Sequence, residues 1–515
     1  MNIYQLLIIC LIIHCIGPLF QDKLFTKILE KNEEKNIMIS PFSIYQVLSI
    51  LANGAVDMTQ KEILQVIFPD NEIEDNNYTL TQLNNNFIKI LNDLSKEDAI
   101  EPSKTTIEEI SLKQGLIFNE IGNSENQNKD IDKSCNNLIF NNVNGLFINK
   151  SFHILDEFML ACENYNISIK ELINDTQIND FCYNNTNGKI TKIIDKIPNG
   201  IAFILINAIY FKGNWSLPFK KENTKKLPFK NVDNSLVKTD TMYKYFDEID
   251  FYEDDKIQMI SLPYRSKKLR FKMIILLPNE EKYTSPLNYL QSEYINLNEL
   301  ILKLQICYNV YLYLPKFKTE FKEKLKRILK EMNMNRAFSN AQFNKMTLDQ
   351  IYINEIIHKT FIQVDEEGTE AAAVTAVVAL FGSALKPDKE YYMYVNHSFI
   401  YMIVSDEIKD SEGNYLIPFL GVVNNLEGEK IQQQNDITKN NDTDLTNESN
   451  IPTTNLKGNI NNENGNNNFS SIEESNITIT NEGNIINNIS SNKVSNIKLN
   501  KTTRFLFIVA AILLI

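Results

Sequence analysis

Residues 366–379 read Glu-Glu-Gly-Thr-Glu-Ala-Ala-Ala-Val-Thr-Ala-Val-Val-Ala and form the most informative stretch of this 515-residue chain. From Thr369 to Ala379 every second residue is small and uncharged. Side chains alternate between the two faces of a strand, so these residues would share one face. Such a face could enter a sheet between two existing strands without steric overlap. Because a strand buried on both faces is normally rich in larger apolar residues, we expect a segment that begins outside a sheet and enters it later.

A helix is the alternative for this stretch, since it is rich in alanine and starts with acidic residues. The β-branched residues argue against a helix, because Val374, Thr375, Val377 and Val378 lower helix propensity. Gly368 adds a flexible pivot at the start of the run. A hinged loop is therefore the favoured interpretation.

Several other segments occur in the order typical of one protein family. They are residues 36–44 (Asn-Ile-Met-Ile-Ser-Pro-Phe-Ser-Ile), 186–190, 206–215 with Phe219, Thr224 and Phe229, 262–264, 274–278, 314–318, 358–359 and 419–424. Together with the hinge-like run, this ordered set resembles the serpin family over residues 22–424. Residues 206–215 hold the only tryptophan of the chain, Trp215.

The resemblance implies an α+β fold, with about nine helices around three β-sheets and an exposed reactive-centre loop. We place the serpin domain at residues 20–426. The length and the 43% content of hydrophobic residues agree with a large domain of this kind. Residues 71–137 are polar and rich in asparagine, and we expect insertions there. Two departures from the family pattern are the sequence Asn-His-Ser-Phe at 396–399 and Asn425, both at positions where a proline is usual.

The family's functional positions map onto named residues of this chain. The hinge set is Glu366, Glu367, Gly368, Thr369, Ala371, Ala372, Ala373 and Thr375. The shutter set, a polar cluster beneath the point where the central sheet opens, is Ser40, Ser43, Asn207 and His358, and Trp215 matches the breach. The alternative for the shutter is four ordinary polar residues with satisfied hydrogen bonds.

The spacing that the family shows puts the scissile bond between Gly382 and Ser383, with Phe381 or Leu385 as alternatives. Lys386 is the nearest basic residue, and Pro387 follows it. We therefore expect a chymotrypsin-like or elastase-like serine protease as target, or a cysteine protease, and not a trypsin-like one.

The function implied is that of a monomeric protease inhibitor that traps an acyl-enzyme by inserting its cleaved loop. A non-inhibitory serpin acting as a carrier, chaperone or surface binding protein is the alternative, followed by an adhesive protein. We expect no enzyme, no cofactor and no metal, because the known catalytic and phosphate-binding motifs are missing; a hydrolase using His358 with a serine is left open. The net charge of −13 and the few cations at 84–96 argue against nucleic acid and heparin as partners.

The two ends predict export and attachment to the cell surface. Residues 1–19 have the short apolar core of a secretory signal peptide. Sequons at Asn77, Asn166, Asn174, Asn447 and Asn476 suit a glycoprotein. Cys162 and Cys182 could form a disulfide, or remain buried free thiols.

Residues 427–504 have the composition of a disordered stalk, and residues 505–515 are uniformly apolar. Eleven residues of helix at about 1.5 Å each cannot cross a hydrocarbon core of about 30 Å. The tail therefore predicts a GPI-anchor signal, with a short tail anchor or an uncleaved apolar tail as alternatives.

Overall fold

The computed structural model describes residues 18–69, 73–95, 138–197, 200–266, 270–292, 295–369, 389–410 and 413–431. Nine α-helices lie in these ranges, as we expected. They are α2 (Pro18–Glu30), α3 (Pro41–Gly54), α4 (Asp57–Ile67), α5 (Asn76–Ser95), α7 (Asp156–Asn164), α8 (Asp175–Asn185), α9 (Pro286–Ser292), α10 (Leu297–Ile301) and α11 (Leu325–Glu331). Two short 3₁₀ turns are η1 (Lys221–Asn223) and η2 (Arg336–Phe338).

The six-stranded sheet has the order β10-β11-β12-β4-β2-β3. Its strands are β2 (Ile139–Ile148), β3 (Ile167–Glu171), β4 (Phe203–Asn214), β10 (Phe317–Lys324), β11 (Glu355–Val364) and β12 (Gly368–Thr369). β11 and β4 are parallel and pair directly from Glu355 with Ile204 to Phe361 with Tyr210. Beyond this paired stretch, β12 lies between them and is antiparallel to both.

The second sheet has ten strands in the path β1-β15-β14-β8-β7-β6-β9-β13, with β5 and β16 also paired to β6. Its strands are β1 (Ile37–Ile39), β5 (Lys225–Lys230), β6 (Leu236–Glu253), β7 (Ile257–Pro263), β8 (Phe271–Pro278), β9 (Gln305–Pro315), β13 (Tyr391–Tyr394), β14 (Phe399–Ser405), β15 (Phe419–Val423) and β16 (Glu429–Lys430). We expected three sheets. In the described part of the chain the strands join into two, because the long strand β6 pairs with β9 along most of its length and with β7 at its end, so that all ten of these strands are linked by hydrogen bonds.

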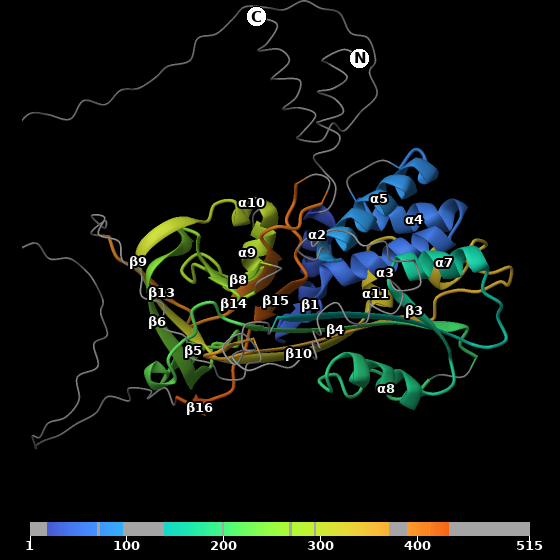
Figure 1. Ribbon diagram of the computed structural model, residues 1–515. Coiled ribbons are helices and arrows are strands. Elements are labelled where there is room, and N and C mark those ends of the chain that lie inside the picture. Colours follow the sequence, from blue (N-terminus) through green and yellow to red (C-terminus); the bar gives the residue numbers. More distant parts are fainter. Residues whose placement is uncertain are drawn as a thin grey trace, which may run out of the picture. The chain divides into compact units, whose positions relative to one another are not determined.

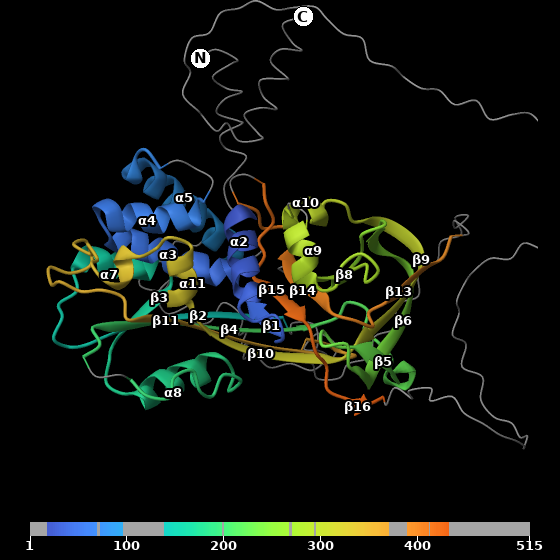
Figure 2. The ribbon, with the colours of Figure 1, turned by 180° about the vertical axis from the view of Figure 1, so that it is seen from behind.

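Helix α3 shows how the sequence forms the centre of the helical layer. Ser40 caps the helix by accepting a hydrogen bond from the backbone N–H of Ser43, and Pro41 occupies the first turn. Nearly all residues of α3 are buried, which explains why the helix is apolar on every side. Helices α3, α4, α5 and α7 cover one face of the six-stranded sheet, and α8 covers the opposite face (Figures 1 and 2).

Each face of the six-stranded sheet has its own buried core. The large core lies on the side of α3, and a smaller core around Phe147, Ile178 and Ile204 lies beneath α8. Strand β4 is almost entirely buried because it faces both cores, which accounts for its continuous apolar sequence. Cys162 and Cys182 are buried free thiols, and burial raises the pKa of each to about 12.

The folded part continues past the domain boundary that we predicted at residue 426. Glu429 and Lys430 form β16 and pair with Lys238 and Val237 of β6. Among the described residues, no helix is both long enough and apolar enough to cross a membrane. Residues 1–17 of the predicted signal peptide, most of the predicted stalk and the apolar tail lie outside those residues, whereas residues 18–19 belong to α2.

Candidate functional site

The hinge begins as a short strand inside the six-stranded sheet. Thr369 pairs with Val364 of β11 and with Gly213 of β4, and Gly368 pairs with Asn214. Gly368 has a φ of 154°, and a Cβ atom there would lie 2.2 Å from the carbonyl oxygen of Gly213. Only glycine can bring the chain this close to β4. The sequence predicts a segment that starts outside the sheet, whereas the structure places Gly368 and Thr369 already within it.

Thr369 points into the core. Its side chain is fully buried, and its Oγ1 lies 2.6 Å from the hydroxyl oxygen of Tyr264. The Tyr264 ring stacks on Trp215, with 4.7 Å between the ring centroids. This hydrogen bond satisfies two polar groups that would otherwise be buried without partners, and it holds the start of the hinge in the sheet.

Trp215 fastens the turn that precedes the hinge. Its indole N–H donates to the carbonyl oxygen of Asp365 at 3.0 Å, and its backbone N–H donates to that of Glu367 at 2.9 Å. A third bond runs from the backbone N–H of Phe219 to the carbonyl oxygen of Glu366 at 2.8 Å. The position that we assigned to the breach therefore contacts the hinge directly.

The two hinge glutamates are engaged by charged and polar side chains of neighbouring strands and turns. The buried Glu366 accepts hydrogen bonds from Thr224 at 2.7 Å and from Lys316 at 3.3 Å. Burial opposes ionisation of Glu366, but the Thr224 hydrogen bond and the Lys316 charge outweigh it and hold the pKa below its usual value. Lys221 forms an ion pair with Glu367 at 2.6 Å. The roles of Lys316 and Lys221 were not predicted from the sequence.

The predicted shutter residues lie together at the contact between β11 and β4. His358 and Asn207 are partners in the register of these two strands, and His358 Nδ1 is hydrogen-bonded to Asn207 Oδ1. The amide nitrogen of Asn207 is hydrogen-bonded to Ser43 Oγ, and the backbone N–H of Ser40 donates to His358 Nε2 at 3.1 Å. All four residues are fully buried.

The hydrogen bonds fix the tautomer of His358. Because Nε2 accepts a hydrogen bond from the backbone N–H of Ser40, Nδ1 carries the ring hydrogen and donates a hydrogen bond to Asn207 Oδ1. Complete burial lowers the pKa of His358 to about 3, so the ring is neutral at pH 7. With both nitrogens engaged and no exposed surface, His358 cannot act as the general base of a hydrolase.

Three further residues belong to the same network and were missed in the sequence. Asn144 of β2 accepts from the Asn207 amide at 2.5 Å and donates to Gln46 Oε1 at 2.8 Å. Asn142 donates to the same Gln46 oxygen at 2.6 Å. One signal in the sequence could have identified the asparagines. Asn142 and Asn144 are two positions apart in a largely apolar strand, so their side chains lie on the same face.

The rest of the predicted site lies outside the described residues. This concerns Ala371, Ala372, Ala373 and Thr375 of the hinge, and Phe381, Gly382, Ser383 and Leu385 around the scissile bond. Over the ranges that the structure describes, no three histidine, cysteine or carboxylate side chains are grouped so as to hold a metal ion.

Comparisons with known proteins agree with this geometry. The family model described as "Serpin (serine protease inhibitor)" matches residues 19–425. Antichymotrypsin-2 of Bombyx mori is 27% identical over 404 residues, which cover 76% of this chain and 94% of the relative. Leukocyte elastase inhibitor of Xenopus tropicalis is 29% identical over 402 residues, covering 75% of this chain and 93% of the relative.

Solved structures show the same fold. The native state of the thermophilic serpin tengpin superimposes with a TM-score of 0.61 at 24% identity, covering 79% of this chain and 92% of that one. The family match spans most of the chain and includes the hinge, the shutter and Trp215. The chain therefore belongs to the serpin family.

Proposed function

We propose that this protein is an inhibitory serpin whose reactive-centre loop is cleaved by a target protease and then inserts between β11 and β4. The proposal rests on the position of Thr369 in the sheet. It is the first residue of the small-residue face, and it is buried between the two strands that the loop would separate. The residues that follow at even spacing, Ala371, Ala373 and Thr375, are equally small and uncharged.

Insertion would extend β12 along a path that the sheet already defines. The direct β11–β4 contact runs from Glu355 with Ile204 to Phe361 with Tyr210, and the incoming strand would replace this parallel ladder by two antiparallel ladders. A central strand gains on the order of a dozen backbone hydrogen bonds at about 1 kcal/mol net each, plus apolar burial. This free energy is available to drag an acyl-enzyme across the molecule and distort its active site.

The shutter would act as the gate of this motion. His358 and Asn207 lie opposite each other on the two strands that must part, so their hydrogen bond breaks when the loop reaches them. Closed, the network satisfies its buried polar groups and opposes spontaneous opening. The intact network therefore supports a metastable native state that persists until the loop is cleaved.

The target class rests on the loop sequence, since relatives of similar identity are named as inhibitors of different proteases. Cleavage between Gly382 and Ser383, or next to Phe381 or Leu385, suits a chymotrypsin-like or elastase-like serine protease, or a cysteine protease. The apolar tail at 505–515 and the polar segment before it support tethering of the exported inhibitor at the cell surface.

The test is incubation of the purified protein with chymotrypsin, elastase, trypsin and papain, followed by denaturing electrophoresis. An inhibitory serpin gives a covalent complex with at least one of the first two enzymes or with papain. Quantitative cleavage of the loop by all of them without any complex would instead select the non-inhibitory alternative.

A further inference from the structure

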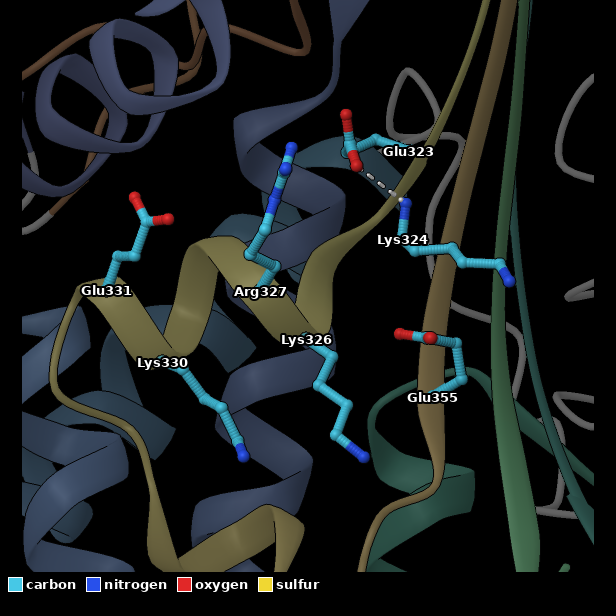
Figure 3. Close-up of a pocket in the computed structure, with 7 residues that line it drawn as sticks. All are labelled: Glu323, Lys324, Lys326, Arg327, Lys330, Glu331 and Glu355. Atoms are coloured by element: carbon cyan, nitrogen blue, oxygen red, sulfur yellow. Dashed lines mark hydrogen bonds between the residues drawn. The ribbon is translucent and has the colours of Figure 1, made fainter. Parts of the chain in front are cut away.

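Two cavities flank helix α11 in the described part of the chain, and Glu331 lines both of them. The first has a volume of about 650 Å³ (Figure 3). Its seven lining residues are Glu323, Lys324, Lys326, Arg327, Lys330, Glu331 and Glu355. Four of these side chains are basic and three are carboxylates. Because their charges nearly cancel, this cavity favours neither an anionic nor a cationic ligand.

The second cavity has a volume of about 470 Å³, which is in the range of small-molecule sites, and seven of its 14 lining residues are apolar. Helix α2, the end of α4, the α9–α10 region and the end of α11 surround it. Its apolar lining residues are Phe25, Val66, Pro69, Leu290, Ile295, Leu297 and Met332.

Asp22 is the buried polar residue of this cavity that lacks a hydrogen-bond partner. Both of its carboxylate oxygens are buried, and neither lies within good hydrogen-bonding geometry of a donor that the structure describes, although the backbone N–H of Leu297 is close enough to affect its pKa. Burial raises the pKa of Asp22 well above its usual value, and the backbone of Leu297 opposes this only weakly. A buried carboxyl group without a partner costs free energy that a suitable ligand would recover.

Neighbouring charges around the cavity are already engaged. Lys27 forms an ion pair with Glu30 at 2.8 Å, and Glu331 forms one with Lys31 at 3.1 Å. Gln65 donates its amide to the carbonyl oxygen of Phe68 at 3.3 Å. Lys23, Thr26 and Asn333 complete the polar part of the lining, and among all these side chains the buried carboxyl group of Asp22 is the one without a hydrogen-bond partner.

We propose that this cavity binds a small amphiphilic amine, whose ammonium group pairs with the carboxylate of Asp22 while its apolar body fills the space between α2, α4, α10 and α11. An ammonium group supplies both the positive charge and the hydrogen-bond donors that the two buried oxygens lack. A fatty acid would fit the volume but would bring no positive charge to hold Asp22 in its ionised form. The site lies apart from the hinge and the shutter and does not depend on protease inhibition.

The experiment uses dansylcadaverine, an aromatic body with a primary amine whose fluorescence rises in apolar surroundings. The probe is titrated into the purified full-length chain beside its N-acetylated form, which has the same body and no charge. Saturable one-to-one binding is expected, with the acetylated probe weaker by about tenfold or more because it cannot form the charge-assisted bond.

Three variants locate the binding. Asp22→Asn keeps the shape and should weaken dansylcadaverine by about tenfold or more, without weakening the acetylated probe to the same extent. Ile295→Trp fills the cavity and should abolish binding of both probes. Glu34→Gln removes an exposed carboxylate and serves as the matched control, with no change expected.

Equal affinity for the two probes, full affinity in Asp22→Asn, or the absence of saturable binding would each overturn the proposal. The thermal midpoint of every variant reports whether it folds. Should Asp22→Asn fail to fold, the contrast between the charged and the acetylated probe, together with Ile295→Trp, still decides the outcome.

Discussion

Thr369 is the single residue on which the proposed insertion depends most directly. Thr369→Arg should convert the protein from an inhibitor into a substrate. An arginine cannot occupy the buried seat next to Tyr264 without an unpaired charge, at a cost of several kcal/mol. Since each ~1.4 kcal/mol added to the insertion barrier slows insertion about tenfold, hydrolysis of the acyl-enzyme should win. Denaturing electrophoresis should show cleaved serpin in place of the covalent complex.

Glu370→Arg is the matched control for this prediction. The alternation of side chains along a strand assigns residue 370 to the opposite face, so its arginine should have a much smaller effect. In the uncleaved protein the arginine can leave the seat for solvent, so Thr369→Arg should cost native stability only on the order of 1–3 kcal/mol, through the lost bond to Tyr264, and the larger cost arises when insertion returns residue 369 to the seat. If Thr369→Arg still formed the complex in full, the inward seat of Thr369 would have no part in inhibition.

His358 makes the stability of the shutter depend on pH. Its pKa is about 3 in the native state, against about 6.5 in the unfolded chain. Between these values the unfolded chain holds the proton and the native protein does not. Native stability therefore falls as pH decreases from 6.5 toward 3, by at most about 1.4 kcal/mol per pH unit from this residue.

Urea unfolding of the wild type and of His358→Gln at pH 7 and pH 5 measures this contribution. Glutamine does not titrate, and all other titrating groups are common to both proteins. The variant should be less stable at pH 7, and its midpoint should fall less between pH 7 and pH 5. Parallel pH dependence of the two proteins would show that the ring does not stay neutral in the network.

At the scale of elements, the length of the reactive-centre loop sets which bond the protease cuts. Counting from Glu366 by the family spacing leads to Gly382-Ser383, with Phe381 and Leu385 as the alternatives. Mass spectrometry of the C-terminal fragment released from the complex should locate the cut between residues 381 and 386. A stable trypsin complex cut after Lys386 would contradict the expected specificity.

The strands also show why the loop has a prepared path. β12 supplies the first antiparallel pairs with β11 and β4, and the turn before it is held by Trp215 and Glu366. An isolated two-residue strand could not persist in water. Its persistence here depends on the two strands beside it, and on the absence of a Cβ at Gly368.

At the scale of the whole molecule, we expect the inhibitor and the anchor to be separable. Deletion of residues 505–515 should release the protein from the cell surface into the medium and leave inhibition unchanged, because the hinge, shutter and breach lie within the family match at 19–425. Phosphatidylinositol-specific phospholipase should release the intact protein. Retention after both phospholipase and alkaline carbonate would favour a tail that stays in the membrane.

The sequence by itself determined the family, predicted about nine helices, the number found among the described residues, and picked out Ser40, Ser43, Asn207 and His358, which the structure brings together. These features depend on local patterns: the small-residue alternation after Gly368, the Ser-Pro start of α3 at residues 40–41, and the apolar run of β4. The joining of two groups of strands into one sheet was not predictable, because it depends on how far a single long strand, β6, pairs with β9 and β7.

Only the tertiary structure decided that Thr369 is already seated, that Asn144 and Gln46 complete the shutter, and that Asp22 is buried beside a cavity. Thr369 and Tyr264 are 105 residues apart in the sequence, and His358 and Asn207 are 151 apart. Burial and hydrogen bonding at such separations arise when distant segments pack together, and they set the pKa of His358 and the environment of Asp22. Local sequence patterns report the backbone and its exposed faces, but not which distant side chain meets each face.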